Sequence, residues 1–348
     1  MVREARRLEK LEALRGVAAL YVFAHHYALE FRWNQYHLGS YATVAVMMFF
    51  LLSGFVIYRS SGASTDTFSL PTYARKRALR ILPAYLVALL LSYFADRLIS
   101  GSPFDVPGFL GNMAFLVDSR FVHGVAAFHG NVPLWSLSYE VWFYVFFAVA
   151  VLAFGRRFEV LRRFALGITI LGLVSVWLVP NPISQYASAF VIWWAGAELA
   201  REYDDTGRIS WRGQMRSLAT MTCIGVLVAV RIALVHGGEV RADRYQRTQL
   251  SHLIITVLII AVGLIWSSAR MWGFGVFLGP FRWFAPLSYG IYIFHYPVIL
   301  FASSERVTGS SVLDLLWVVP TVLALAWVFD RQLHVWLSRR LVRSHAHE

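Results

Sequence analysis

The chain has 348 residues, of which 58% are hydrophobic and only 15% are charged. A soluble globular domain carries about 25% charged residues, so this composition excludes a disordered chain, a collagen-like repeat and an ordinary cytosolic domain. The net charge of +12 rests on 32 basic residues that separate long apolar runs and do not gather on one face, which indicates an integral membrane protein that does not bind nucleic acid.

Ten apolar runs are long enough to cross about 30 Å of hydrocarbon, which takes about 20 residues. In chain order they lie at 11–30, 41–58, 79–99, 134–153, 164–180, 183–200, 217–236, 250–268, 283–302 and 312–329. The first run is no cleaved signal peptide, because Arg15 interrupts it and no small-residue cleavage site follows. With both termini in the cytoplasm, the inner segments hold 23 basic residues and the outer ones eight, which the positive-inside rule favours.

The sequence therefore predicts an all-α polytopic membrane protein of about ten transmembrane helices with both termini cytoplasmic. One transmembrane domain is expected over 1–330, followed by a cytoplasmic basic tail, 331–348, whose composition suits an amphipathic segment on the inner leaflet. The longest connection, 101–133, is predicted to lie outside and to lack regular structure, either as a surface lid or as a substrate-facing element.

The first predicted helix carries Arg15, His25 and His26, and ionisable side chains are costly inside a bilayer, so each is a candidate for function. Eleven positions of about 100° bring His26 within about 20° of the face of Arg15, about 16 Å further along the axis. His25 lies on another side of the helix, about 80° away from the face of Arg15. The alternative is that Arg15 extends to the membrane surface and His26 is a packed or interfacial residue. Their shared helix face favours a functional pair.

The third predicted helix begins with a basic run in which Arg77 and Arg80 are three residues apart. They share a helix face, where two guanidinium groups could converge on phosphates. The alternative is a run of charge that only sets the orientation of the helix, and Arg75 and Lys76 are assigned to that role.

Glu140 is the clearest carboxylate well inside a predicted span, at about the depth of His26. A carboxylate beside a neutral histidine could orient its tautomer, as in a catalytic triad, or Glu140 could be satisfied by neighbouring Ser, Tyr or Trp side chains. His295, in the ninth predicted helix, could assist the site, but pairing with a hydroxyl is the favoured interpretation. Gly54 is interpreted as a small residue at which helices pack. Cys223, the single cysteine, allows neither an intramolecular disulfide nor a thiolate metal cluster, and no metal motif is present.

Five segments, in this order along residues 1–300, resemble the acyltransferase 3 family of bacterial membrane O-acyltransferases. They are Leu11-Glu-Ala-Leu-Arg15-Gly16 through His26, Phe49-Phe-Leu-Leu-Ser53-Gly54-Phe55, Arg77-x-x-Arg80, Trp135-Ser-Leu-Ser-Tyr-Glu140-x-x-Phe143-Tyr144 and Ser288-Tyr-Gly-Ile-Tyr292-x-x-His295-x-Pro297. Arg15 and His26 match that family's Arg-x10-His element, whereas Glu12 stands where the family usually has Asp. No extra soluble domain is expected after the membrane part, which resembles the family's minimal form.

This resemblance implies transfer of an acyl group, most often acetyl, from cytoplasmic acyl-CoA to a hydroxyl of a cell-envelope or exported glycan such as an exopolysaccharide or lipopolysaccharide. It implies catalysis by His26 with support from Glu140, and binding of the donor by Arg15, Arg77 and Arg80. Acetyl-CoA is then a substrate and no cofactor is bound permanently. The implied location is the bacterial inner membrane, with lipids, a carbohydrate acceptor and polysaccharide-synthesis machinery as partners.

Two other functional classes use the same features. A transporter or flippase would use the buried charges as a pathway without chemistry, but no inverted repeat of broken helices is seen in the sequence. A non-catalytic scaffold would tolerate alanine at His26 and Glu140 together. Release of free thiol from acetyl-CoA that depends on acceptor separates the enzyme from the transporter.

Overall fold

Long helices account for most of the chain in the computed structural model, which describes residues 2–33, 41–61, 68–117, 125–235, 240–305 and 308–337. The long helices are α1 (Val2–Glu30), α2 (Ala42–Ser60), α3 (Leu70–Ser100), α5 (Trp135–Phe154), α6 (Phe158–Leu178), α7 (Pro182–Thr206), α8 (Trp211–Leu234), α9 (Val240–Ser268), α11 (Ser288–Glu305) and α12 (Ser311–Trp327). The short ones are α4 (Val106–Met113), α10 (Phe274–Phe277), the 3-10 turns η2 (Phe128–Gly130), η3 (Val132–Leu134) and η4 (Gly279–Leu287), and the π-helical turn η5 (Val328–Leu333). The all-α prediction is confirmed for the described residues.

Eight of these segments are long and apolar enough to cross a membrane. The other two of the ten predicted spans, 11–30 and 183–200, are also helical, as α1 and α7, but polar residues lower their mean hydropathy. Fifteen of the 25 residues of α7 are buried, so this helix is surrounded by protein rather than by lipid and tolerates polar groups. The count of ten crossings and the placement of both termini inside stay predictions.

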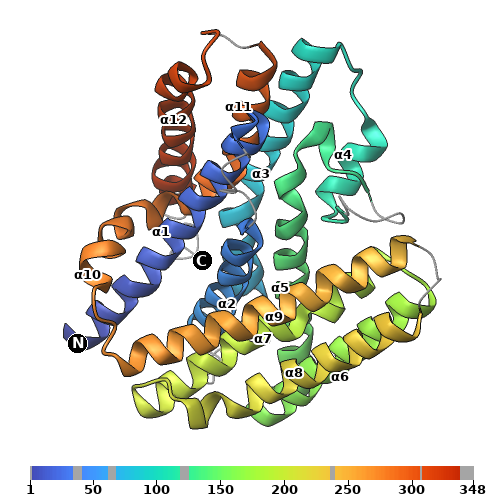
Figure 1. Ribbon diagram of the computed structural model, residues 1–348, viewed down its shortest axis with the longest axis vertical. Helices are drawn as coiled ribbons and strands as arrows, with labels where there is room; N and C mark the ends of the chain where they lie inside the picture. Colours follow the sequence, from blue (N-terminus) through green and yellow to red (C-terminus); the bar gives the residue numbers. More distant parts are fainter. Residues whose placement is uncertain are drawn as a thin grey trace, which may run out of the picture.

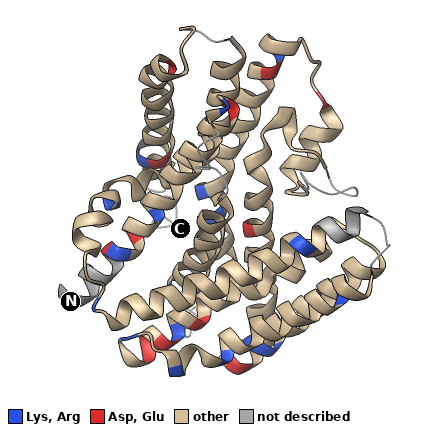
Figure 2. Ribbon diagram, viewed as in Figure 1, with Lys and Arg blue, Asp and Glu red and all other residues tan. Residues whose placement is uncertain are grey.

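The helices form two groups that meet at α1, α2 and α5 (Figure 1). In this view α6, α7, α8 and α9 lie side by side across the lower part, and α3, α11 and α12 stand in the upper part. The first helix crosses the molecule diagonally and packs against α2, α11 and η4. Most charged residues lie near helix ends and leave long uncharged stretches between them, as expected of helices in a bilayer (Figure 2).

Two glycines bring α2 and α7 into backbone contact. A Cβ placed on Gly54 would lie 2.0 Å from the carbonyl oxygen of Trp193, and one on Gly196 would lie 2.1 Å from that of Leu51. Only glycine allows this approach from both sides. The prediction that Gly54 is a helix-packing residue is therefore confirmed.

Two predicted boundaries differ from the structure. The ninth span was expected to start at 283, but 283–287 belong to η4, where Pro280 and Pro286 interrupt the α-helical hydrogen bonds, and α11 begins at Ser288. The 101–133 connection was expected to lack regular structure, yet its described part contains α4, η2 and η3. Buried Asn112 holds this segment together, because its side-chain amide donates to the carbonyl of Ala126 and its backbone carbonyl accepts from the Tyr85 hydroxyl.

The basic tail was predicted to begin at 331. In the structure helical conformation continues from α12 through η5 to residue 337, and residues 338–348 lie outside the described part. The π-helical turn contains Asp330, which was not among the predicted site residues and which is buried beside Arg80.

Candidate active site

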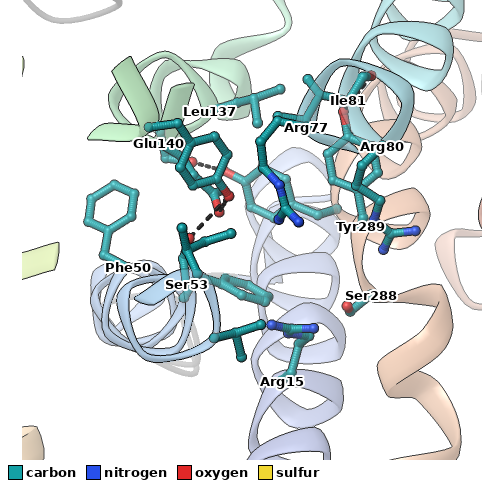
Figure 3. Close-up of a pocket in the computed structure, with 16 residues that line it drawn as sticks. Arg15, Phe50, Ser53, Arg77, Arg80, Ile81, Leu137, Glu140, Ser288 and Tyr289 are labelled. Carbon is teal, nitrogen blue, oxygen red and sulfur yellow. Dashed lines mark hydrogen bonds between the residues drawn. The ribbon is translucent and has the colours of Figure 1, made fainter. Parts of the chain in front are cut away.

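Four of the five predicted site residues line one cavity of about 150 Å³. Arg15 comes from α1, Arg77 and Arg80 from α3, and Glu140 from α5. In Figure 3 the three arginine side chains extend toward the same space from their two helices, with Glu140 opposite them. The prediction that Arg77 and Arg80 share a helix face is borne out, since both line this cavity.

Arg80 is anchored by Asp330. Nη1 of Arg80 donates to Oδ1 of Asp330 at 2.9 Å, and Oδ2 of the same carboxylate accepts from the backbone N–H of Gly290 at 2.8 Å. The guanidinium carbon also lies 5.2 Å from the centre of the Tyr289 ring. The carboxylate is 2% exposed, so this ion pair fixes the Arg80 side chain between α3, α11 and the end of α12.

Arg77 and Arg15 have no such anchor. Nε of Arg77 is buried without a hydrogen-bond partner, and neither side chain forms an ion pair with any residue that the structure describes. A buried N–H donor without a partner costs about 1–3 kcal/mol, and this one belongs to a side chain that lines the cavity, where it is open to an acceptor on a bound molecule.

A chain of hydrogen bonds holds Glu140. The indole N–H of Trp193 donates to Oγ of Ser53 at 3.2 Å, and Ser53 and the Tyr144 hydroxyl are 3.1 Å apart. Tyr144 in turn donates to Oε1 of Glu140. Because the single proton of the Tyr144 hydroxyl is donated to Glu140, Ser53 is the donor to Tyr144, and every donor in the chain is directed toward the carboxylate. The Glu140 carboxylate is therefore held in place within a cavity that three arginine side chains also line.

His26, the fifth predicted residue, lies in a second cluster and does not line the cavity. Its Nδ1 atom is 3.0 Å from the carbonyl oxygen of Val22 and 3.1 Å from Nε2 of His295. His295 is completely buried, and its Nδ1 is 2.7 Å from the carbonyl oxygen of Tyr292. The favoured interpretation of His295, a pairing with a hydroxyl, is corrected here: its partners are two backbone carbonyls and the His26 ring.

These contacts assign the tautomers of both rings. A carbonyl oxygen only accepts, so Nδ1 of His295 carries the proton and Nε2 of His295 offers a lone pair. Nδ1 of His26 faces that lone pair and the Val22 carbonyl, so it is the donor. The other nitrogen of His26, Nε2, is then unprotonated and has no hydrogen-bond partner among the described residues. A free imidazole lone pair is what a general base requires.

Glu140 was expected to orient His26. In the structure Glu140 bonds to Tyr144 and faces the arginines, while His295 contacts the His26 ring. The correction has a simple cause: equal depth in two helices does not place two side chains on facing sides, and α11, not α5, packs against α1 at that level.

Tyr292 connects the two clusters. Its ring lines the arginine cavity, its carbonyl oxygen accepts from His295, and its hydroxyl is 2.5 Å from Oγ of Ser136. Along α1, Arg15 and His26 are eleven residues apart, which corresponds to about 16 Å of helix axis. A donor with its phosphates at the arginines would therefore have to extend by about three helical turns to bring its reactive end to His26. Among the described residues no group of three His, Cys, Asp or Glu side chains could hold a metal ion.

Sequence reasoning missed Asp330 and undervalued His295. Asp330 comes directly after the last predicted span, 312–329, and a carboxylate at the end of an apolar helix could have indicated a buried partner for an arginine. His295 had been placed at a depth similar to that of His26, and that coincidence was the signal for the pair.

Comparisons with known proteins find three proteins named as acyl or O-acetyl transferases that are similar to this chain. The chain is 36% identical over 156 residues to the acyltransferase MdmB of Streptomyces mycarofaciens, over 40% of this chain and 38% of that protein. It is 26% identical over 322 residues to the peptidoglycan O-acetyltransferase OatA of Listeria monocytogenes, over 83% of this chain and 49% of that protein. An O-acetyl transferase of Shigella phage Sf6 is 32% identical over 182 residues, or 47% and 53% of the two chains. The chain thus spans about half, or less, of the length of these relatives.

No solved structure matches the chain. The model of the acyltransferase 3 family, described as an acyltransferase domain, matches residues 8–331. That range contains the arginine cavity, the histidine pair and every segment from which the resemblance was drawn. This chain is a member of the acyltransferase 3 family.

Proposed function

We propose that the protein is a membrane O-acyltransferase that moves an acyl group, most often acetyl, from cytoplasmic acyl-CoA to a hydroxyl of a cell-envelope or exported carbohydrate. The observation that carries the proposal is the cavity in which Arg15, Arg77 and Arg80 meet with Glu140 as the lining carboxylate. The named activities of the relatives, acyl and O-acetyl transfer, support the same reaction class.

The arginines bind the donor in this proposal. CoA carries three phosphates, and guanidinium groups recognise phosphate oxygens through paired N–H donors. A volume of about 150 Å³ equals that of an apolar cavity that holds one benzene, so the site takes a phosphate group or the thioester arm but not a whole CoA. The donor then reaches the cavity from the side predicted to be cytoplasmic.

The histidine pair performs the proton transfer. Nε2 of His26 takes the proton from the acceptor hydroxyl, and the resulting oxygen nucleophile attacks the thioester carbonyl. The carbon–sulfur bond breaks, the CoA thiolate leaves and takes the proton from Nε2 of His26, and the acyl group stays on the acceptor oxygen. His295 accepts the Nδ1 proton of His26 in a hydrogen bond and stabilises the imidazolium, which is the task of the third member of a catalytic triad.

A His26→Ala variant tests the assignment. We expect the rate of thiol release from acetyl-CoA in the presence of acceptor to fall by about 10² to 10⁴, the usual contribution of a general base. His25→Ala is the matched control, because His25 is the neighbouring histidine and makes no hydrogen bond to His295 or to another described residue. It should retain activity within about tenfold.

The acceptor is identified in the producing cells. O-acetyl signals of surface and secreted glycans are compared by NMR before and after mild alkali, with both variants confirmed in the membrane. Loss of an alkali-labile acetyl signal in His26→Ala alone supports the proposal and names the acceptor. Full thiol release by folded His26→Ala protein would exclude His26 as the base, and no thiol release by the wild type with any acceptor would favour a transporter.

A further inference from the structure

A second cavity, of about 520 Å³, lies between α1, α2, α7 and α9. It is separate from the arginine cavity because α2 presents a different face to each. Met48, Leu51 and Phe55 recur at helical spacing and line the second cavity, whereas Phe50 and Ser53 line the first. The catalytic proposal uses none of the residues of this second cavity.

The wall of this cavity is hydrocarbon. Leu51 and Phe55 of α2 face Ile259, Ile260 and Leu264 of α9 across it. Cavities lined in this way stay dry and are filled by apolar ligands. In a bilayer, the available apolar ligand for a gap between helices is a lipid acyl chain.

The mouth of the cavity is basic. Lys10 of α1, Arg208 of the α7–α8 turn and Arg270 of the α9–α10 turn converge there from three parts of the chain, and no described acidic residue lines the cavity. Nζ of Lys10 lies 3.2 Å from Sδ of Met271, also a lining residue. Three cations on an apolar pocket complement one anionic head group with an attached chain.

The α9–α10 turn holds an unusual conformation at this mouth. Arg270 and Met271 both have φ of +53°, the left-handed region that non-glycine residues seldom adopt. The surrounding fold maintains it, and it brings both side chains to the cavity. The adjacent Trp272 is 82% exposed, and exposed tryptophans of membrane proteins lie at the level of the lipid head groups.

We propose that this cavity binds an anionic phospholipid of the leaflet on the predicted cytoplasmic side. One acyl chain lies between α2 and α9, and the phosphate group lies among Lys10, Arg208 and Arg270. Charge complementarity selects an anionic head group, and the exposed Trp272 places the mouth at the level where that head group resides.

Lipid titration of the purified full chain, read by native mass spectrometry, tests the head-group contacts. Phosphatidylglycerol should bind more tightly than phosphatidylcholine with the same acyl chains. Each basic residue near a membrane surface contributes about fivefold to the affinity for an anionic lipid. Replacing Arg208 and Arg270 by Gln should therefore weaken the binding of phosphatidylglycerol about 25-fold. Arg212→Gln is the control, since this exposed arginine does not line the cavity.

Gly263→Leu tests the acyl-chain seat. A Cβ at Gly263 meets nothing within 4 Å although the residue lines the cavity, so leucine should fold normally and occupy the lipid's space. Gly167→Leu is the control, because Gly167 in α6 is equally open but lies outside the cavity. Phosphatidylglycerol binding should fall at least tenfold in Gly263→Leu and stay unchanged in Gly167→Leu.

Equal binding of the two lipids, or unchanged phosphatidylglycerol binding in the double arginine variant, would overturn the proposal. So would displacement of the lipid by the free head group, glycerophosphoglycerol, at matching concentration, because that result would assign the site to a soluble phosphate. All readouts are binding measurements on folded protein, so they are independent of whether the chain transfers acyl groups.

Discussion

Arg77 and Arg80, three residues apart on one helix, differ in their contacts. Arg80 is held by Asp330 and its guanidinium group lies near the Tyr289 ring, whereas Nε of Arg77 is buried without a hydrogen-bond partner. A guanidinium group has five N–H donors, so the bond to Asp330 fixes Arg80 and still leaves it donors for a ligand. In the proposed function, the acceptor that Arg77 lacks in the protein comes from the donor substrate.

Arg77→Ala should therefore weaken binding of the acyl-CoA donor. A hydrogen bond to a charged group contributes about 1.5–3 kcal/mol, so KM for acyl-CoA should rise about 10- to 150-fold while the rate at saturation changes less. Arg75→Ala, two residues away and not a cavity residue, is the matched control and should leave KM unchanged. An equal rise in both variants would mean that the basic run acts only through its overall charge.

His295→Ala should lower kcat and leave KM for the donor nearly unchanged. Without the Nε2 acceptor, His26 loses the partner that fixes its tautomer, and we expect a loss of about 10- to 100-fold, a fraction of the contribution of a general base. In His295→Gln the amide oxygen can accept the same proton, so this variant should regain part of the rate. If Gln is no better than Ala while both proteins are folded, His295 only fills space.

At the scale of the helices, the α2–α7 contact determines where Ser53 and Trp193 lie, and with them Tyr144 and Glu140. Gly54 and Gly196 each face a carbonyl of the partner helix at a distance that no Cβ allows. The close approach of these two helices is thus a condition for the geometry of the cavity. Disturbing it should affect both stability and the site.

Gly54→Val should separate the two helices and lower the free energy of unfolding by about 1–3 kcal/mol, the usual cost of overpacking. Gly167→Val is the control in α6, where a Cβ meets nothing. Thermal unfolding in detergent should show a lower Tm for Gly54→Val only. A Tm equal to that of the control would show that α7 moves aside without cost.

At the scale of the whole molecule, α1 and α7 decide the topology, because they are the two predicted crossings that are too polar to be recognised by hydropathy alone. If α7 crosses, its two ends lie on opposite sides of the membrane. The charges agree: segment 201–216, around the α7–α8 turn, holds four arginines, and the α6–α7 turn, 179–181, holds none.

Cysteines placed at exposed Val179 and Asp205, on the two sides of α7, should distinguish the topologies in a Cys223→Ser background. An impermeant maleimide added to intact cells should label the cysteine at 179 and not the one at 205. In permeabilised cells both should react, which controls for reactivity. Labelling of both positions in intact cells would mean that α7 does not cross the membrane. Both termini can lie inside only if the number of crossings is even, so another helix would then have to cross in place of α7.

The sequence by itself determined whatever depends on local periodicity and composition. It predicted ten helices, all of which are present, and placed Arg77 and Arg80 on one face because three residues nearly complete a turn. It also assigned Gly54 to helix packing. Its errors lie at the 101–133 connection, where buried contacts of Asn112 order the chain, and at 283–287, where prolines favour a 3-10 run.

Only the tertiary structure decided which side chains meet. His26 and His295 are 269 residues apart in the chain, and Arg80 and Asp330 are 250 apart. Both pairs exist because α11 and the end of α12 pack against α1 and α3, and the rotation of a packed helix about its axis depends on side-chain fit along its whole length. Periodicity tells which residues of one helix share a face, and it says nothing about which neighbour that face meets; this is why Glu140 bonds Tyr144 beside the arginines and His295 takes the place beside His26.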